Sequence, residues 1–179
     1  MHAQVDILKN GGIGVLPTDT LYGVVASARN KEAVERVYTL KGRAPAKPCI
    51  ILISSLTDLS VFTVTLSPTL QSTLKKYWPG PTSIILPCAG EKFAYLHRGT
   101  HSLAFRLPKQ EALIKLLQET GPLIAPSANP EGLTPAKTIE EARAYFGERV
   151  DFYEDGGTLT NPPSTLIRIN ENGEVEKLR

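Results

Sequence analysis

The sequence predicts one α/β domain over residues 1–179, built on a mixed sheet with flanking helices. Three observations carry this prediction. Helical and strand patterns alternate along the chain, no linker or second composition regime divides it, and hairpin signals place some neighbouring strands antiparallel. A chain of 179 residues with 41% hydrophobic and 21% charged residues has the balance of an ordinary globular domain.

The first half of the chain alternates between helix and strand. The opening helix ends at Gly11, because glycine readily takes the left-handed conformation that terminates helices. Pro17 stops the first apolar strand, and Asn30 suits the N-cap of a helix whose apolar residues recur at helical spacing. The predicted elements are a helix at 1–10, strands at 12–17 and 21–28, a helix at 31–43 and a strand at 49–54.

The second half carries its own start and stop signals. Ser67-Pro68 supplies an N-cap and a proline at the first helical position, and the WPGP segment at 78–81 cannot continue that helix. Thr138 and Glu141 form a capping-box pattern, and Asn172-Gly173 predicts a tight hairpin. The predicted elements are helices at 67–77, 109–120 and 138–146 and strands at 82–88, 102–108, 122–128, 151–155, 164–169 and 174–178.

Composition and charge exclude several functional classes. The net charge is +2 and no basic run occurs, so bulk electrostatics give little support for tight nucleic-acid binding, although a local patch is compatible with it. Cys49 and Cys88 lie in apolar runs and are expected to be buried, and the scattered histidines predict no metal site. No signal peptide and no membrane-length apolar segment is visible, so a cytoplasmic protein is expected.

Two polar segments follow apolar elements in the first half. Thr18-Asp19-Thr20 comes after a buried strand and either binds a ligand or satisfies its own turn. Lys41 and Arg43, with Lys47 close behind, put three cations within seven residues. These cations either converge on a polyphosphate or complement the dipole at the end of a helix.

Two further candidates lie in the second half. Ser127 and Asn129 leave an apolar strand among small residues that allow a ligand to approach the backbone, although a simple proline-flanked turn fits equally well. Ser102 and Arg106 share one face of a strand, with Leu103 and Phe105 on the other. A strand-borne arginine needs an anionic partner, which is either a substrate carboxylate or a structural one.

Common catalytic signatures are missing from the sequence, which has no Walker A, GxGxxG or HExxH motif and no defensible triad. Instead, the motifs taken together resemble the YrdC-like family of threonylcarbamoyl-AMP synthases, in its short form. In chain order these are PTDTLYG at 17–23, KGR at 41–43, WPGP at 78–81, LAFRLP at 103–108, APSAN at 125–129 and PSTLI at 163–167.

This resemblance implies a fold and a reaction. The fold is an open, twisted α/β sheet with a concave binding face. The reaction joins L-threonine, bicarbonate or CO2, and ATP into threonylcarbamoyl-AMP with release of pyrophosphate, and other proteins then transfer the threonylcarbamoyl group to a tRNA adenosine. Partners would therefore be ATP, L-threonine and bicarbonate, with tRNA and the downstream transfer proteins as further partners. Mg²⁺ would arrive on the ATP, and no dedicated metal site is expected.

The resemblance also assigns roles to individual residues. Lys41 and Arg43 would be catalytic, as half of a Lys-x-Arg and Ser-x-Asn tetrad, and Arg106 would hold the threonine carboxylate. Two positions depart from longer relatives, which often have Asn in place of Lys47 and a threonine-contacting His in place of Leu52. The implied threonine-binding residues are Thr20, Arg106, Ala125 and Ser164, and the implied nucleotide-binding residues are Arg43, Lys47, Ser102, Ser127, Asn129 and Arg179.

Two other functions remain open at this point. A non-catalytic RNA-binding module on the same fold is one, although the near-neutral charge argues against it as the sole function. A related carbamoyl-adenylate site that serves another acceptor is the other. Pyrophosphate release measured with and without threonine separates both from the threonine-dependent reaction.

Overall fold

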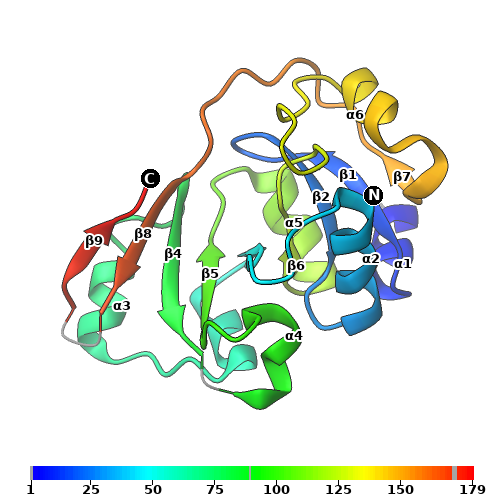
Figure 1. The fold of residues 1–179 in the computed structure, drawn as a ribbon. Helices are drawn as coiled ribbons and strands as arrows, with labels where there is room; N and C mark the ends of the chain where they lie inside the picture. The colour runs from blue at the N-terminus through cyan, green and yellow to red at the C-terminus, as the bar shows by residue number, and fades with distance from the viewer. Residues whose placement is uncertain (1, 89, 171–172) are drawn as a thin grey trace.

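A single mixed sheet runs through the molecule (Figure 1), in a computed structural model that describes residues 2–88, 90–170 and 173–179. Its strands are β1 (Ile13–Pro17), β2 (Tyr22–Ser27), β3 (Ile50–Leu52), β4 (Thr82–Pro87), β5 (Ser102–Arg106), β6 (Leu123–Ile124), β7 (Phe152–Tyr153), β8 (Thr165–Ile169) and β9 (Val175–Lys177). They lie in the order β7-β1-β2-β6-β3-β5-β4-β8-β9. Pairs β1–β2 and β8–β9 are antiparallel, whereas β3–β5 and β4–β8 are parallel, which confirms the predicted mixed sheet.

Helices flank this sheet. The α-helices are α1 (His2–Lys9), α2 (Lys31–Lys41), α3 (Pro68–Leu74), α4 (Ala94–His97), α5 (Glu111–Thr120) and α6 (Ile139–Phe146), and the 3₁₀ segments are η1 (Leu56–Phe62), η2 (Glu91–Phe93) and η3 (Gly147–Arg149). Within the described residues no helix has the length and apolar character needed to cross a membrane.

The sheet buries a different core on each face. One core includes residues of α2, η1, α4 and α6 together with Phe105 and Ile84 of the central strands. The other is smaller and lies under α1 and α5, where Leu8 and Leu116 pack on Leu52. Helices α1 and α5 pack in this second core with residues of β1, β2, β3 and β6. The same face of β4, β5 and β8 is less covered, and side chains on it, such as Ile85 and Ala104, are only partly buried.

Most predicted signals operate as expected. Asn30 accepts a hydrogen bond from the Ala33 amide at 2.9 Å, and Gly42 ends α2 in the left-handed conformation. Thr138 caps α6 by accepting from the Glu141 amide, but the Glu141 carboxylate accepts from the Lys137 amide instead of the Thr138 amide. The predicted capping box is therefore confirmed on one side only.

Some elements differ from the prediction. Segment η1 was not predicted. It begins at a Ser55 N-cap, and the Asp58 carboxylate accepts from the Ser54 and Ser55 amides. Strand β6 keeps only Leu123–Ile124 of the predicted run, because the chain then turns into the pocket described below. The predicted β8–β9 hairpin is present, while Asn172 of its predicted turn lies outside the described residues.

Candidate active site

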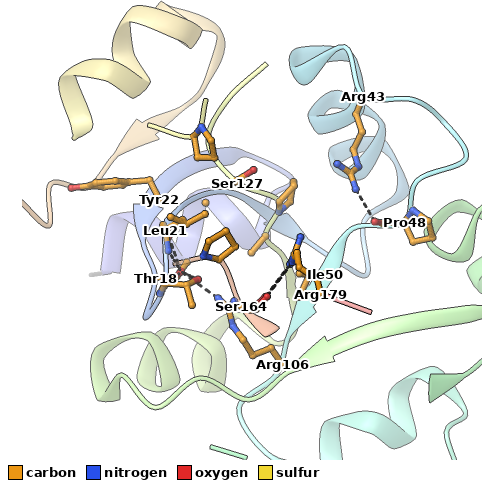
Figure 2. Close-up of a pocket in the computed structure, with 16 residues that line it drawn as sticks. Thr18, Leu21, Tyr22, Arg43, Pro48, Ile50, Arg106, Ser127, Ser164 and Arg179 are labelled. Carbon is orange, nitrogen blue, oxygen red and sulfur yellow. Dashed lines mark hydrogen bonds between the residues drawn. The ribbon is translucent and has the colours of Figure 1, made fainter. Parts of the chain in front are cut away.

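A pocket of about 230 Å³ lies where strand ends and loops from both halves of the chain converge (Figure 2). The segment between β7 and β8 arches over this end of the sheet (Figure 1) and brings Pro163 and Ser164 to the pocket. The lining residues are Thr18, Thr20, Leu21, Tyr22, Gly23, Arg43, Pro48, Ile50, Arg106, Ala125, Pro126, Ser127, Pro135, Pro163, Ser164 and Arg179. The structure thus gathers residues from five of the six sequence motifs, all but the tryptophan-proline segment.

The Thr18–Thr20 turn forms one buried side of the pocket. The Thr18 hydroxyl donates to the Leu21 carbonyl at 2.7 Å and accepts from the Thr20 amide at 3.2 Å. Because its single proton is used in that bond, the 3.1 Å contact between the two threonine hydroxyls takes its proton from Thr20. The Thr20 oxygen is then an acceptor at the pocket wall, and the turn is both self-satisfying and ligand-facing.

Arg106 forms the floor beside this turn, and it is only 4% exposed. Its Nη2 donates to the Thr18 hydroxyl at 3.2 Å and lies 3.1 Å from Asp19 Oδ1. The ion pair lacks hydrogen-bond geometry, so both Asp19 oxygens and Arg106 Nε are buried without a hydrogen-bond partner among the described residues. Burial lowers the pKa of Arg106, while the charge of Asp19 opposes that shift.

Asp19 bears on whether Arg106 pairs with a structural carboxylate or with a substrate carboxylate. The expected anionic partner of Arg106 exists within the protein, which supports the structural reading of this arginine. Arg106 nevertheless lines the pocket, and within the described part of the chain its Nη1 neither makes a hydrogen bond nor belongs to the fully buried, unpartnered atoms. A guanidinium held on one edge and open on another can still receive a ligand carboxylate.

Ser164 and Arg179 line the pocket near Arg106. Ser164 is buried, and its hydroxyl lies 2.9 Å from the hydroxyl of fully buried Ser83 on β4. Arg179 donates to the Ser164 carbonyl from Nε at 3.2 Å and from Nη2 at 3.1 Å (Figure 2). This contact holds a second cation at the pocket, close enough that its charge also lowers the pKa of Arg106.

The loop after α2 carries Arg43 to the pocket. The Arg43 side chain turns back on its own loop. It donates to the Lys47 carbonyl at 2.9 Å and to the Pro48 carbonyl at 2.9 Å, the second of which Figure 2 shows. Lys47 is more distant from the pocket wall and forms an ion pair with Glu131. Of the two predicted nucleotide-binding cations in this loop, only Arg43 lines the pocket in the described structure.

Lys41 does not line the pocket. It is 3% exposed, and its ammonium donates to the carbonyls of Ser127 and Asn129. Burial, together with the nearby charge of Arg43, lowers the pKa of Lys41 to about 8. Lys41 thus links the end of α2 to the predicted Ser-x-Asn segment, and its two hydrogen bonds hold the turn that carries Ser127.

The Ser-x-Asn segment divides into two roles. Ser127 lines the pocket and donates its hydroxyl to Asn129 Oδ1 at 2.6 Å. Asn129 is buried and donates from Nδ2 to the Pro130 and Leu133 carbonyls at 2.9 and 2.7 Å. All of the Asn129 amide is therefore engaged within the turn, which it stabilises directly.

Ser102, a predicted nucleotide contact, lies away from the pocket, and so does Leu52. Ser102 is at the far end of β5, on the same face as Arg106 but four residues along, or about 13 Å at strand spacing. There it borders a separate surface hollow with Thr100 and Arg168. Leu52, at the position where longer relatives often have histidine, is fully buried in the core under α5.

Sequence reasoning left several contributing residues unassigned. Thr18 and Asp19 were noticed as part of a polar turn, but only contact with Arg106 reveals their role. Tyr22 anchors the arching segment, because its hydroxyl accepts from the Gly156 amide and donates to the Gly157 carbonyl, both at 2.8 Å. Ser83 and Glu131 gave no local signal at all, since their partners are more than 80 residues away in the chain.

Comparisons with known proteins agree with this arrangement. A family model described as "Telomere recombination" (Sua5/YciO/YrdC) matches residues 6–179. Two relatives, each named threonylcarbamoyl-AMP synthase, come from Marinobacter nauticus, with 34% identity over 89% of this chain and 85% of the relative, and Thiobacillus denitrificans, with 33% identity over 94% and 89%. The structure of P. abyssi Sua5 complexed with L-threonine superposes with a TM-score of 0.90 and 29% identity, covering 99% of this chain and 52% of that one.

Proposed function

The chain belongs to the Sua5/YciO/YrdC family, and we propose on this basis that it is a threonylcarbamoyl-AMP synthase, an ATP-using nucleotidyltransferase of tRNA modification. The single observation that best supports this proposal is the pocket itself. It combines a buried arginine and threonine hydroxyls on one side with Arg43 and Ser127 on the other. Such a pocket suits a small amino acid placed next to a phosphate chain.

The proposed reaction consumes L-threonine, bicarbonate and ATP and releases threonylcarbamoyl-AMP, pyrophosphate and water. The threonine amine first takes up bicarbonate as a carbamate with loss of water. A carbamate oxygen then attacks the α-phosphorus, and the bond to the β,γ-pyrophosphate breaks. No protein nucleophile is required, because nucleotidyl transfer depends on positioning and on neutralising the charge of the phosphates.

We assign the amino acid to the buried side. Arg106 would hold the threonine carboxylate through the guanidinium edge that Asp19 and Thr18 leave open. Thr20 and Ser164 would supply hydroxyl contacts, and Ala125 would leave space for the side chain. The L-threonine bound to the related P. abyssi protein supports the substrate class, and the four residues all lie at or in the pocket.

We assign the phosphates to the side with Arg43, Ser127 and Arg179. Arg43 would leave its loop carbonyls, or use its remaining donors, to contact the triphosphate. Lys41 would act as the residue that fixes the Ser127 turn rather than as a direct contact. Ser102 would reach an outer part of the nucleotide along the less covered sheet face.

Mg²⁺ fits this site only as part of the nucleotide complex. The pocket offers hydroxyls, carbonyls and guanidinium groups, and among the described residues no three His, Cys, Asp or Glu side chains gather to hold a metal ion. Mg²⁺ would screen phosphate charge and keep several waters of its own. The remaining proposed partners are tRNA and the transfer proteins that consume the adenylate in the cytoplasm.

One assay tests the proposal. The protein is incubated with ATP, Mg²⁺ and bicarbonate, with or without L-threonine, while pyrophosphate is quantified and products are identified by mass spectrometry. Threonine-dependent pyrophosphate release with threonylcarbamoyl-AMP formation is the expected result. Release without dependence on threonine would indicate a carbamoyl-adenylate site for another acceptor, and no release, with RNA bound, would indicate an RNA-binding module.

A further inference from the structure

The Lys-x-Arg loop and the Ser-x-Asn turn are joined by contacts from both directions. Lys41 donates its ammonium to the turn carbonyls of Ser127 and Asn129. In return, the Glu131 amide donates to the Lys41 carbonyl at 2.7 Å. These bonds fix the base of the loop. In the outer part, residues 44–48, the Lys47 carbonyl accepts from Arg43 and from the Tyr38 hydroxyl, the latter at 2.8 Å.

Glu131 holds that outer part with both carboxylate oxygens. Oε2 accepts from the Ala44 amide at 2.8 Å, and Oε1 receives the ammonium of Lys47. These two hydrogen bonds lower the pKa of Glu131, so the carboxylate is ionised near neutral pH. One side chain therefore has two separable tasks, one on the loop backbone and one on the lysine charge.

The lysine contact has a consequence for the proposed phosphate site. The backbone of Lys47 lies against a pocket residue, because its carbonyl accepts from Arg43 Nε. Its ammonium, however, is paired with Glu131 and its side chain is 61% exposed. An exposed ion pair of this kind contributes little net energy, so a phosphate chain can compete for the lysine.

We propose that Glu131 is a positioning residue with a latch function: it tethers the Arg43 loop through the Ala44 amide and withholds Lys47 from the phosphate side until a polyphosphate exchanges for its carboxylate. This inference rests on the proposed function, because it places the triphosphate beside Arg43. It goes beyond that function in making Lys47 a conditional contact whose availability is set by Glu131.

Three variants separate the two tasks. Glu131→Gln keeps one oxygen for the Ala44 amide but removes the charge that holds Lys47. Glu131→Ala removes both the tether and the latch, and Lys47→Met removes the cation while keeping most of its stem. Asp151→Asn is a matched control, because the Arg36–Asp151 pair is also exposed, at 46% and 40%, and neither residue lines the pocket.

Isothermal titration with inorganic tripolyphosphate, and then with ATP, reads out the latch directly. Glu131→Gln should bind tripolyphosphate about two- to fivefold more tightly than the parent, which is the range of an exposed ion pair. The gain should disappear when Lys47→Met is added, Glu131→Ala should bind more weakly, and Asp151→Asn should match the parent. In turnover, Glu131→Gln should lower the KM for ATP and leave that for threonine unchanged.

Binding by Glu131→Gln that equals or falls below the parent would overturn the latch, and so would a gain that persists without Lys47. Absence of any tripolyphosphate binding by the parent would also overturn it. The proposed function fails on a different measurement, since it requires threonine-dependent pyrophosphate release. A protein that shows the tripolyphosphate pattern but no such release would keep the latch and lose the synthase.

Discussion

The two sides of the pocket are built in different ways. The threonine side, made by Thr18, Thr20, Arg106 and Ser164, consists of side chains that are each at most 5% exposed and are linked to one another or to the core. The phosphate side, made by the loop of Arg43 and Lys47, is held mostly through backbone groups of the loop, which bond to Arg43, Tyr38 and Glu131, and by one exposed ion pair.

From this difference we expect one side of the pocket to select its substrate and the other to bind and release a phosphate chain. Buried, mutually bonded groups keep their geometry before the ligand arrives, so a substrate that fits them gains specificity at little cost in ordering. Exposed cations held by replaceable partners can instead follow a charged chain and release it afterwards. The threonine side is therefore expected to discriminate, and the phosphate side to adapt.

The largest expected effect is at the floor of the threonine side. Arg106→Lys keeps a positive charge near Asp19 but loses the planar fork, which lysine cannot reproduce. The apparent KM for threonine should rise about 100-fold, the equivalent of one lost charge-assisted interaction, while that for ATP changes little. Steady-state pyrophosphate release at varied threonine measures the change.

A substrate analogue completes this test. Threonine amide lacks the carboxylate, so the parent should use it poorly and the Arg106→Lys protein should discriminate less between acid and amide. If the parent uses both equally well, Arg106 serves only Asp19 and the threonine side is misplaced. The contrast between a threonine side and a phosphate side of the pocket would then no longer hold.

A slightly smaller effect is expected on the phosphate side. Arg43→Ala should lower kcat/KM for ATP about 30-fold, because it removes a charge-assisted contact from the transition state while the loop remains tethered by Glu131. The melting temperature should stay close to that of the parent, since Arg43 bonds only to exposed or partly buried loop carbonyls. Turnover near the parent level would mean that this side is not built around Arg43.

The free energy of unfolding should depend on pH through Lys41. Its pKa is lowered to about 8 in the folded protein from 10.5, so between these values the unfolded chain binds more protons and stability rises with pH on account of this group. The free-energy difference between the parent and Lys41→Met should therefore grow by about 3 kcal/mol from pH 7.5 to pH 10.5, a little less than the full shift. Urea unfolding of both proteins at three pH values measures it. A constant difference would indicate that Lys41 titrates as an ordinary exposed lysine.

Ser127 and Asn129 are expected to behave differently although they form one motif. Asn129→Ala leaves two turn carbonyls without their donor and should destabilise the protein by about 1–2 kcal/mol. Ser127→Ala removes one neutral hydrogen bond, to Asn129 Oδ1, and should destabilise the protein by about 0.5–1 kcal/mol; its main effect should be weaker ATP binding, because Ser127 lines the pocket and Asn129 does not. Denaturation and ATP titration of both variants separate the roles, and equal destabilisation would make the whole motif structural.

The sequence predicted the fold and the membership of the pocket better than the role of each residue. Alternating patterns and caps specify elements locally, which is why the mixed sheet and the Asn30 cap were foreseen. Whether a polar residue faces a ligand or a carbonyl depends on distant partners. Lys41 and Asn129 fit the family pattern in sequence, yet contacts across more than 80 residues or within the turn itself occupy them.

The same limit explains the residues that were missed. Ser83 is one hydroxyl in an apolar strand, and Glu131 is one acid in a proline-rich loop, so neither has a local pattern. Strand pairing brings the first against Ser164, and the turn after β6 brings the second against the Arg43 loop. Tertiary contact alone creates their roles.

The smallest expected effect tests whether the threonine side depends on support from below. Ser83 is fully buried, and among the residues that the structure describes its hydroxyl bonds only to that of Ser164. Ser83→Ala therefore leaves the Ser164 hydroxyl free to rotate among its remaining contacts. We expect the KM for threonine to rise about threefold with kcat and the KM for ATP unchanged, since a neutral hydrogen bond contributes about 0.5–1.5 kcal/mol.

Two control variants accompany this test. Ser83→Thr, which restores the hydroxyl, should recover most of the loss. Ser60→Ala, which removes an exposed hydroxyl bonded within η1, should have no effect on either substrate. A rise in both KM values together would show that Ser83 merely supports the strand, whereas a change confined to threonine would show that the buried network is what holds that side of the pocket in place.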